Sequence, residues 1–381
     1  MPQLGHASSD DFAGPRLYNA RDVLPSNPLT LVPADLGLFR AALLRWYARH
    51  CRPLPWRSTR DPYRIWISEV MLQQTRVGAV RDHYAEFLRR FPDVKTLASA
   101  KLQHVLAAWS GLGYYRRARA LHHAARLLMR DHAGELPSRA TSLRSLPGIG
   151  RYTAAAIASI AFGEPSAVVD GNVERVLRRV LGWPRESLPR IWDAAGLLLS
   201  RRSPGNFNQA MMELGAVVCL PLRPRCDACP VRRLCVTRGA LEGLPHPHFA
   251  RGWRDRVGIA RPPKPPRKSA ETTYGLASRG DRVYLVRRRA GETLMPGMWE
   301  LPQLPNGAPH LPGVGRCGNS NNVNPPEFTL RHSITVTDHT AHVCRVSAAG
   351  LRGGRWVPIR DAAALPLTGL ARRILRRASL I

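Results

Sequence analysis

The stretch LRSLPGIGRYTAAAIASIAFG, residues 143–163, decides the fold, because it sets the turn L-P-G-I-G between two segments with helical spacing. Gly148 and Gly150 permit a tight turn, and the backbone N–H groups of such a turn point outward beside a helix N-terminus. Together with Pro147 they form a nest that suits a phosphate of a DNA backbone. P-G-x-G is also common as a plain turn between helices, so the hairpin alone does not decide the function.

The sequence on both sides of this hairpin predicts one helix after another. From Leu36 to Gly215, successive segments carry apolar residues three to four positions apart, with Pro and Gly at the joins. After a Pro- and Arg-rich stretch, apolar and polar residues alternate between Gly-rich turns, which is typical of strands. We therefore expect a mainly α domain at 31–244, a linker at 245–269 and a smaller α+β domain at 270–381, preceded by a loose extension at 1–30.

Composition favours a polyanionic partner. The 381 residues carry 57 Lys and Arg against 27 Asp and Glu, a formal net charge of +30. Such a field attracts nucleic acid, although basic surfaces also serve membranes and solubility, and the Arg excess over Lys also fits a GC-rich genome. No apolar run reaches the length of a spanning helix, and the N-terminus lacks an apolar signal segment. We expect a cytoplasmic bacterial protein, at the nucleoid through DNA binding, without a membrane partner.

Four cysteines lie close together after the helical region, in the pattern C-x6-C-x2-C-x5-C. Thiolates select iron–sulfur clusters, zinc or Cu(I), and structural zinc usually shows two C-x2-C pairs rather than one. The spacing therefore favours a 4Fe–4S cluster, with zinc and unligated core cysteines as alternatives. Cys51, Cys317 and Cys344 have no such neighbours and are expected to be buried thiols. The expected ligands are Cys219, Cys226, Cys229 and Cys235.

Two carboxyl groups stand out in the helical region. Asp170, in VVDGNVERVL at 168–177, follows an apolar run and directly precedes a helix, where an aspartate is ordinarily an N-cap. Glu69, in LPWRSTRDPYRIWISEVMLQQTRV at 54–77, has a strongly apolar neighbourhood. Burial would keep such a carboxyl protonated near neutral pH and make it an acid, but a solvent-facing helix glutamate is the commoner case. These residues alone leave both interpretations open.

The order of these motifs resembles a known superfamily. L-P-G-I-G-R-Y-T-A, then V-D-G-N-V, then the cysteine pattern resemble the helix-hairpin-helix DNA glycosylases of the endonuclease III superfamily. The resemblance implies that the hairpin grips the DNA backbone and that Asp170 lies in the active site. Bifunctional members carry a Schiff-base lysine where this chain has Tyr152. Without that lysine the imine route to strand cleavage has no obvious nucleophile, so a monofunctional enzyme is implied.

Residues 54–77 narrow the resemblance to the adenine DNA glycosylase (MutY) family. This implies a base-excision-repair enzyme that removes adenine opposite 8-oxoguanine or guanine in double-stranded DNA. Glu69 would protonate N7 of the adenine, and ionised Asp170 would stabilise the oxocarbenium-like sugar while water completes the displacement. The resemblance also assigns an adenine pocket to Arg52, Arg57, Tyr152 and Asn172, the latter two beside the catalytic pair, and contacts inside the duplex to Gln74, Thr75, Leu112 and Tyr114.

The C-terminal region carries a further resemblance. TLMPGMWELPQ at 293–303 resembles the signature of the Nudix-like domain with which adenine glycosylases recognise 8-oxoguanine. The acid cluster of a Nudix box is absent from the sequence, so pyrophosphate hydrolysis is not expected. The family's recognition loop reads aromatic–Ser/Thr–His, and here Ile334, Thr335 and Val336 take those places. Thr335 keeps the hydroxyl, but the histidine is lost unless His339 compensates, which makes discrimination of 8-oxoguanine less secure than excision.

Two rival functions are compatible with parts of the sequence. A thymine glycosylase for T·G mismatches shares the hairpin, the aspartate and often the cluster, but the C-terminal domain and E-V-M-L-Q-Q-T argue against it. A non-catalytic, DNA-binding iron–sulfur redox sensor explains the cysteines and the charge, but it leaves Glu69, Asp170 and the second domain without a role. We expect a monomer.

Overall fold

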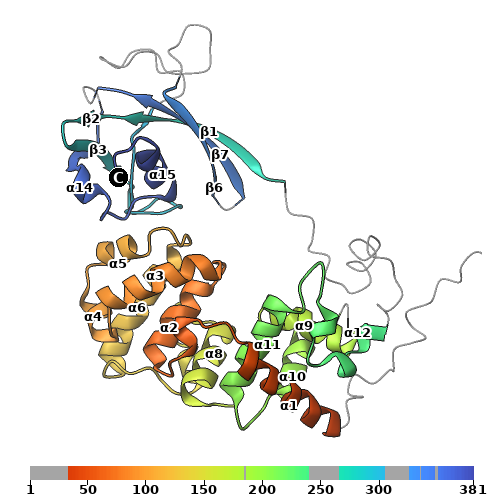
Figure 1. The fold of residues 1–381 in the computed structure, drawn as a ribbon. Helices are drawn as coiled ribbons and strands as arrows, with labels where there is room; N and C mark the ends of the chain where they lie inside the picture. Colours follow the sequence, from red (N-terminus) through yellow and green to blue (C-terminus); the bar gives the residue numbers. More distant parts are fainter. Residues whose placement is uncertain (1–32, 184–185, 240–265, 305–325, 335, 348–350) are drawn as a thin grey trace, which may run out of the picture.

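The computed structural model describes residues 33–183, 186–239, 266–304, 326–334, 336–347 and 351–381. These form a helical body and a smaller body that contains sheets (Figure 1). The expected extension at 1–30 and most of the expected linker at 245–269 lie outside the described residues. The mainly α fold with a smaller α+β C-terminal domain is confirmed. The exact domain boundaries remain predictions.

Helices occupy most of the described chain between Pro33 and Gly239, and two apolar clusters hold them together. The first cluster draws on α2 to α8, and the second on α1 and α8 to α11. Short 3-10 turns, η1 to η3, lie at Pro55–Arg57, Cys226–Ala228 and Arg232–Leu234. The helices are α1 (Pro33–His50), α2 (Pro62–Leu72), α3 (Val77–Arg90), α4 (Val94–Ser99), α5 (Leu102–Ala108), α6 (Arg116–Asp131), α7 (Ala140–Leu143), α8 (Arg151–Phe162), α9 (Gly171–Leu181), α10 (Leu188–Leu198), α11 (Pro204–Val217) and α12 (Val236–Gly239).

Helix α8 belongs to both clusters. Ala154 and Ala158 face the first cluster, whereas Ala155 and Ala156 face the second. The small alanine side chains allow α2 and α11 to pack closely against α8. This arrangement brings residues from α2, α8, α9 and α11 to one place in the domain.

The helix starts that matter for function follow simple local rules. Asp61 caps α2 by accepting from the backbone N–H groups of Tyr63 at 2.8 Å and Arg64 at 3.3 Å, with Pro62 in the first turn. The hairpin before α8 turns at Gly148, whose φ is +79° and whose added Cβ would lie 2.7 Å from Ala120 Cβ. Gly150 instead has an extended backbone with open space around it, so its conformation is open to other residues.

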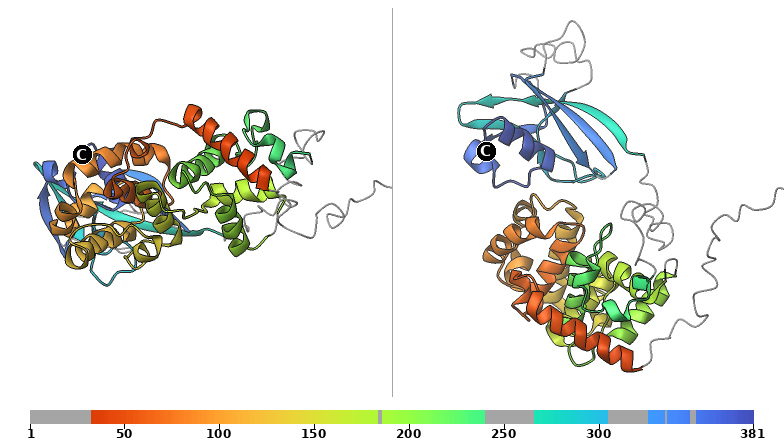
Figure 2. Two further views of the ribbon diagram at one scale, coloured as in Figure 1. Left: turned by 90° about the horizontal axis from the view of Figure 1, so that it is seen from below. Right: turned by 45° about the vertical axis from the view of Figure 1, so that its right-hand side comes forward.

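In its described residues, the C-terminal body contains two small sheets and two helices (Figure 2). One sheet has the order β5-β1-β7-β6, in which β1 and β7 run parallel and β6 and β7 form an antiparallel hairpin. In the other, β3 pairs with β2, β4 and β8. The elements are β1 (Lys268–Leu276), β2 (Ser278–Arg279), β3 (Arg282–Arg287), β4 (Trp299–Glu300), β5 (Gln303–Leu304), β6 (Phe328–Ile334), β7 (Thr337–Arg345), β8 (Gly354–Pro358), α14 (Ile359–Ala362) and α15 (Gly369–Arg377).

The two bodies touch through the segment before β4. Met298, from the C-terminal body, is fully buried within the first apolar cluster of the helical domain. Arg119 on α6 donates to the carbonyl of Pro296 in the same segment. Among the described residues, no helix is both long enough and apolar enough to cross a membrane.

Helix α11 approaches the start of α9 so closely that the contact requires glycine. A Cβ added at Gly215 would lie 2.6 Å from Asn172 Cβ and 3.1 Å from Asn172 backbone atoms. Gly215→Ala should therefore lower the free energy of unfolding by about 1–3 kcal/mol, the usual cost of overpacking, as measured by urea denaturation.

Gly196→Ala on α10 is the matched control, because a Cβ there meets nothing within 4 Å. That variant should be unchanged or more stable by about 0.5–1 kcal/mol, since alanine favours a helix over glycine. Equal effects of the two substitutions would show that the approach of α11 to α9 is not tight.

Candidate active site

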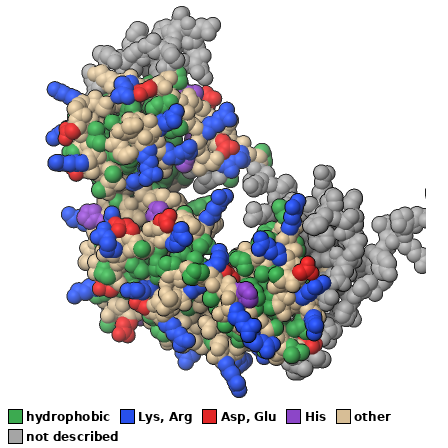
Figure 3. Space-filling view, viewed as in Figure 1, with side chains coloured by type: hydrophobic (Ala, Val, Ile, Leu, Met, Phe, Trp, Pro, Cys, Tyr) green, Lys and Arg blue, Asp and Glu red, His purple; other side chains and the backbone are tan. Residues whose placement is uncertain are grey.

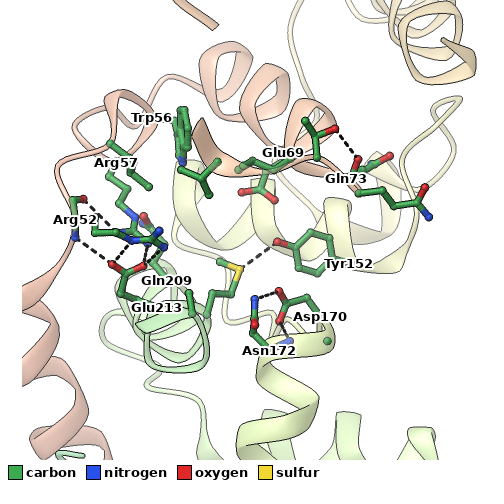
Figure 4. A pocket seen from close by; sticks show the side chains of 18 of the residues that line it. Arg52, Trp56, Arg57, Glu69, Gln73, Tyr152, Asp170, Asn172, Gln209 and Glu213 are labelled. Atoms are coloured by element: carbon green, nitrogen blue, oxygen red, sulfur yellow. Dashed lines mark hydrogen bonds and ion pairs between the residues drawn. The ribbon is translucent and has the colours of Figure 1, made fainter. Parts of the chain in front are cut away.

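A pocket of about 560 Å³ opens in the helical domain where α2, α8, α9 and α11 converge (Figure 4). This volume is ordinary for a small-molecule or single-base site. Most of the residues assigned to the site from the sequence line it. They are Arg52, Arg57, Glu69, Gln74, Thr75, Tyr114, Tyr152, Asp170 and Asn172.

Glu69 lies on the buried face of α2, with an exposed fraction of 4%. Burial, and then the nearby charge of Asp170, raise the pKa of Glu69 to about 7, although Tyr152 and Arg57 oppose the rise. Its Oε2 atom is buried without a hydrogen-bond partner in the part of the chain that the structure describes. A carboxyl of this kind is half protonated near neutral pH and can donate a proton to a ligand in the pocket.

Asp170 has the opposite environment at the start of α9. It accepts from the backbone N–H groups of Asn172 at 2.9 Å and Val173 at 2.7 Å, and from Asn172 Nδ2 at 3.1 Å. N–H donors at a helix N-terminus stabilise negative charge. The expectation that Asp170 is an N-cap is therefore correct, and the same geometry leaves its half-exposed carboxylate at the pocket.

Tyr152, in the first turn of α8, lies between the two carboxyl groups (Figure 4). Its hydroxyl is placed to donate to Met212 Sδ at 3.1 Å, and it is also close enough to Glu69 to lower the pKa of that carboxyl. Burial, followed by the charges of Glu69 and Asp170, raises the pKa of Tyr152 well above its usual value. Tyr152 therefore stays neutral and keeps a hydroxyl that can donate a hydrogen bond beside Glu69.

A second buried glutamate, Glu213 on α11, closes the other end of the pocket. Arg52 donates to it from Nε at 2.8 Å and from Nη2 at 2.6 Å, and Arg57 donates from Nη2 at 2.6 Å. Burial alone would raise the pKa of Glu213, but the hydrogen bonds from Arg52 and Arg57 lower it to about 2. This ion-paired group holds the two arginines against the pocket wall.

Several residues of the pocket are not predicted from the sequence. Glu213 and Gln209 belong to FNQAMMELGAVV, a mostly apolar helix in which polar residues recur four positions apart. That isolated polar stripe on a buried helix was the available signal. Trp56, Gln73, Met212 and Arg117 also line the pocket, but no comparable sequence pattern marks them.

The residues expected to meet the duplex divide into two groups. Gln74, Thr75 and Tyr114 line the pocket, and the Tyr114 side chain is 44% exposed. Leu112 does not line it, because its side chain is 4% exposed and packs in the first apolar cluster. In this conformation Leu112 is a core residue, so the expected contact of its side chain with the duplex is not available.

The hairpin lies outside the pocket and faces solvent. Gly148 and Gly150 are exposed, Pro147 is half-buried, and Ile149 between the glycines is buried and anchors the turn. The buried Ile149 side chain thus fixes the turn, and the backbone of the two glycines is exposed to solvent. Thr335, the residue expected to recognise 8-oxoguanine, lies outside the described residues.

The four clustered cysteines line one cavity beside α9. All four are half-buried, and Arg179 donates to Cys219 Sγ at 3.1 Å. Among the described residues, no group of three or more His, Cys, Asp or Glu side chains is arranged as a metal site. Four soft thiols around one cavity fit the donor set of an iron–sulfur cluster, and zinc accepts the same donors.

The remaining cysteines differ from the expectation of buried thiols. Cys51 is exposed. Cys344 is buried, but it is disulfide-bonded. The expectation is therefore wrong for these two, and Cys317 lies outside the described residues.

Comparisons with known proteins identify the family to which each body is similar. Residues 67–195 match the family described as HhH-GPD superfamily base excision DNA repair protein, and residues 273–377 match the NUDIX domain family. An adenine DNA glycosylase of Mus musculus is 41% identical over 315 residues, covering 71% of this chain and 61% of the relative. An adenine DNA glycosylase of Schizosaccharomyces pombe is 32% identical, covering 73% of this chain and 72% of the relative.

Among solved structures, a thermostable thymine-DNA glycosylase superposes with a TM-score of 0.51 at 30% identity, covering 54% of this chain and 97% of that one. The helical domain thus defines a helix-hairpin-helix base-excision glycosylase fold with a Nudix-like domain after it. The chain belongs to the adenine DNA glycosylase family. It spans about three fifths of the length of the mouse relative.

The environment of Glu69 predicts how stability depends on pH. Its pKa rises from 4.5 to about 7 on folding, so its contribution to stability is present below pH 4.5 and is lost as the pH rises through 7. Glu69→Gln removes this loss. Relative to wild type, the variant should gain about 3 kcal/mol of unfolding free energy between pH 4 and pH 8, as measured by urea denaturation at each pH.

Glu135→Gln, at an exposed glutamate outside the pocket, is the matched control. A difference between Glu69→Gln and wild type that stays constant across this pH range would mean that Glu69 is not held in a desolvated site.

Proposed function

We propose that the protein is a base-excision-repair DNA glycosylase that hydrolyses the N-glycosyl bond of adenine mispaired with 8-oxoguanine or guanine. The observation that carries this proposal is the pair of carboxyl groups in one pocket, Glu69 without a hydrogen-bond partner on Oε2 and Asp170 with three N–H donors. Hydrolysis of an N-glycosyl bond needs one carboxyl group that donates a proton and one ionised carboxylate that stabilises positive charge. Membership of the adenine DNA glycosylase family supports adenine as the base.

The division of labour follows from the two environments. Adenine leaves poorly unless a ring nitrogen is protonated, so Glu69, whose pKa is raised to about 7, donates a proton to N7. As the C1′–N9 bond breaks, positive charge develops on the sugar, and the Asp170 carboxylate stabilises that charge. Water then completes the displacement. Asn172 positions Asp170 through its Nδ2 donor, and Tyr152 lies between the two carboxyl groups. Arg52, Arg57 and Glu213 bound the pocket at its other end.

The reaction is proposed to be monofunctional. Tyr152 occupies the place of the Schiff-base lysine of bifunctional relatives, and no lysine lines the pocket among the described residues. A buried tyrosine hydroxyl with a raised pKa is not an amine nucleophile and forms no imine. The product is therefore an abasic site with an intact strand.

The proposed partner is duplex DNA containing the mispaired adenine, bound by a monomer in the bacterial cytoplasm. Lys and Arg side chains are spread over both bodies and outnumber Asp and Glu (Figure 3), which favours a polyanion. The exposed hairpin at Gly148 supplies backbone N–H groups for a phosphate. Gln74, Thr75 and Tyr114 at the pocket rim would fill the space left when adenine rotates out of the stack.

The C-terminal domain is proposed to read the base opposite adenine through the β6–β7 hairpin. Ser333 donates to Asp338 at 2.5 Å across this hairpin, and Arg267 also pairs with Asp338. His339 pairs with His332 within the strands rather than standing at the turn. It therefore does not replace the histidine of the family's recognition loop, and we propose weaker preference for 8-oxoguanine over guanine than in relatives that carry that histidine.

We propose that Cys219, Cys226, Cys229 and Cys235 hold a 4Fe–4S cluster that shapes the loop rather than taking part in excision. The loop lies beside α9 and outside the pocket, and it carries several arginines for DNA. When bound, the cluster would hold the loop closed by four thiolate bonds. The arginines are Arg223, Arg225, Arg232 and Arg233.

The carboxyl pair is tested by replacing each group with its amide. Glu69→Gln and Asp170→Asn should each lower single-turnover excision of adenine by about 10²–10⁴, because one loses the acid and the other the charge. Duplex affinity, measured by fluorescence anisotropy, should change little. In wild type, the rate should fall as the pH rises above 7, because ionised Glu69 has no proton to donate. Full activity of either variant contradicts the assignment.

The choice of base is tested with duplexes that carry A, T or U opposite G or 8-oxoguanine. Alkali-dependent cleavage at adenine alone supports the proposal, and cleavage without alkali contradicts a monofunctional reaction. Cleavage at T opposite G identifies a thymine glycosylase. No abasic product on any duplex favours a non-catalytic sensor.

The cluster is tested by iron, sulfide and zinc analysis of wild type and Cys229→Ser. Wild type should contain iron and acid-labile sulfide in equal amounts, and the variant should lose both together with duplex affinity or folded protein. At saturating enzyme, any variant that still binds should excise adenine at nearly the wild-type rate. Stoichiometric zinc in place of iron would make the cluster assignment wrong.

A further inference from the structure

The loop between α5 and α6, residues 110–115, has a conformation that must be held by its surroundings. Its φ angles are +110° at Gly111, +68° at Gly113 and +46° at Tyr114. A left-handed backbone is unfavourable for a tyrosine and persists where neighbouring contacts fix it. Tyr114 is also the exposed aromatic residue at the pocket rim. Whatever fixes this loop therefore fixes the position of Tyr114.

The C-terminal domain contacts the outer side of this loop. Arg372 on α15 donates from Nε to Ser110 Oγ at 2.9 Å. The Tyr115 hydroxyl donates to the carbonyl of Leu367 at 3.3 Å, and Ser110 Oγ lies 3.5 Å from the same carbonyl. Tyr115 is 7% exposed, so its hydrogen bond is shielded from water. The residues on both flanks of the strained segment are thus tied to the second domain.

The helical domain contacts the inner side of the same loop through Arg117, which is 6% exposed. Its guanidinium donates to the carbonyls of Leu112 at 2.9 Å and Gly113 at 3.2 Å. Further bonds, 2.6 to 2.9 Å long, reach the end of α2 and the segment after it. Their acceptors are the carbonyls of Val70, Met71 and Gln73 and the hydroxyl of Thr75.

Arg117 therefore links loop 110–115 to the end of α2 and to the residues on either side of Gln74. Gln73 and Thr75 flank Gln74, which has a φ of +57° and lines the pocket like Tyr114. Val70 and Met71 directly follow Glu69 on α2. A displacement of loop 110–115 would pull on these carbonyls through one rigid planar group.

We propose that the C-terminal domain is a structural part of the excision site, in which Arg372 and the Leu367 carbonyl latch loop 110–115 through Ser110 and Tyr115. The latch positions Tyr114 directly, and it positions Glu69 through Arg117. It acts whatever base stands opposite adenine, so it is separate from recognition through the β6–β7 hairpin. The proposal rests on the function proposed above and names Arg372, Ser110 and Tyr115 as positioning residues.

The latch is tested in the full-length protein with Arg372→Ala and Tyr115→Phe. Each removes a latch contact and leaves the apolar core in place. Both should lower single-turnover adenine excision about tenfold on A·G and on A·8-oxoguanine duplexes alike, the size expected for a lost shielded hydrogen bond. Duplex affinity should stay within about twofold of wild type. Arg372→Lys should restore part of the rate, because lysine also donates to Ser110.

Two matched variants control for charge and for a lost hydroxyl. Arg377→Ala removes an exposed positive charge from the same helix. Tyr84→Phe removes a hydroxyl that donates to the Arg64 carbonyl at 3.3 Å, also from a buried ring in the helical domain. Both should excise adenine at the wild-type rate.

Hydrogen–deuterium exchange gives a readout that does not depend on activity. Amides of residues 110–117 should exchange faster in Arg372→Ala and Tyr115→Phe than in wild type, Arg377→Ala and Tyr84→Phe. If wild type does not excise adenine, the proposed function fails and exchange alone still decides the latch. Unchanged exchange, or a rate loss confined to 8-oxoguanine duplexes, overturns the latch.

Discussion

The burial of one carboxyl group without a charged partner is the constraint on which the rest of the site depends. Glu69 is nearly inaccessible on α2, and no ion pair involves it in the part of the chain that the structure describes. Glu213 is at least as buried, yet two guanidiniums hold its pKa at about 2, whereas the pKa of Glu69 is about 7. A glutamate side chain is thus ionised where two arginines pair with it, at Glu213, and remains an acid where it is buried without an ion pair, at Glu69. Arg57, whose charge lowers the pKa of Glu69, is ion-paired with Glu213 instead.

Local sequence patterns were sufficient for the fold and for the residues next to a motif. The helical periodicity, the hairpin at Gly148 and the cap at Asp170 are all encoded within a few residues, and the structure has them where the sequence places them. Glu213 lies 144 positions after Glu69, and Arg117 meets α2 through backbone carbonyls that carry no sequence signal. Leu112 is the opposite case. Its motif matches a DNA-contacting pattern, but its side chain is buried in the core. Tertiary packing, which spacing does not report, decides these three cases.

The two domains are joined by direct side-chain contacts as well as by the chain that connects them. Met298 completes an apolar cluster of the helical domain, and α15 contacts the loop beside the pocket. A domain that supplied recognition alone would not need to insert a buried side chain into its neighbour. The extent of this contact explains why residues far apart in sequence, such as Ser110 and Arg372, can serve one site.

Helix α8 has a mechanical consequence for how a substrate reaches the pocket. Its alanines are packed into two apolar clusters at once, so the two halves of the helical domain share one wall. A hinge that opened the pocket would have to pull α8 out of one cluster or the other, and close-packed interiors resist such separation. The pocket of the helical domain therefore keeps a nearly fixed shape. For the duplex DNA proposed as the substrate, the large movement then belongs to the nucleotide, which rotates out of its stack to reach the pocket.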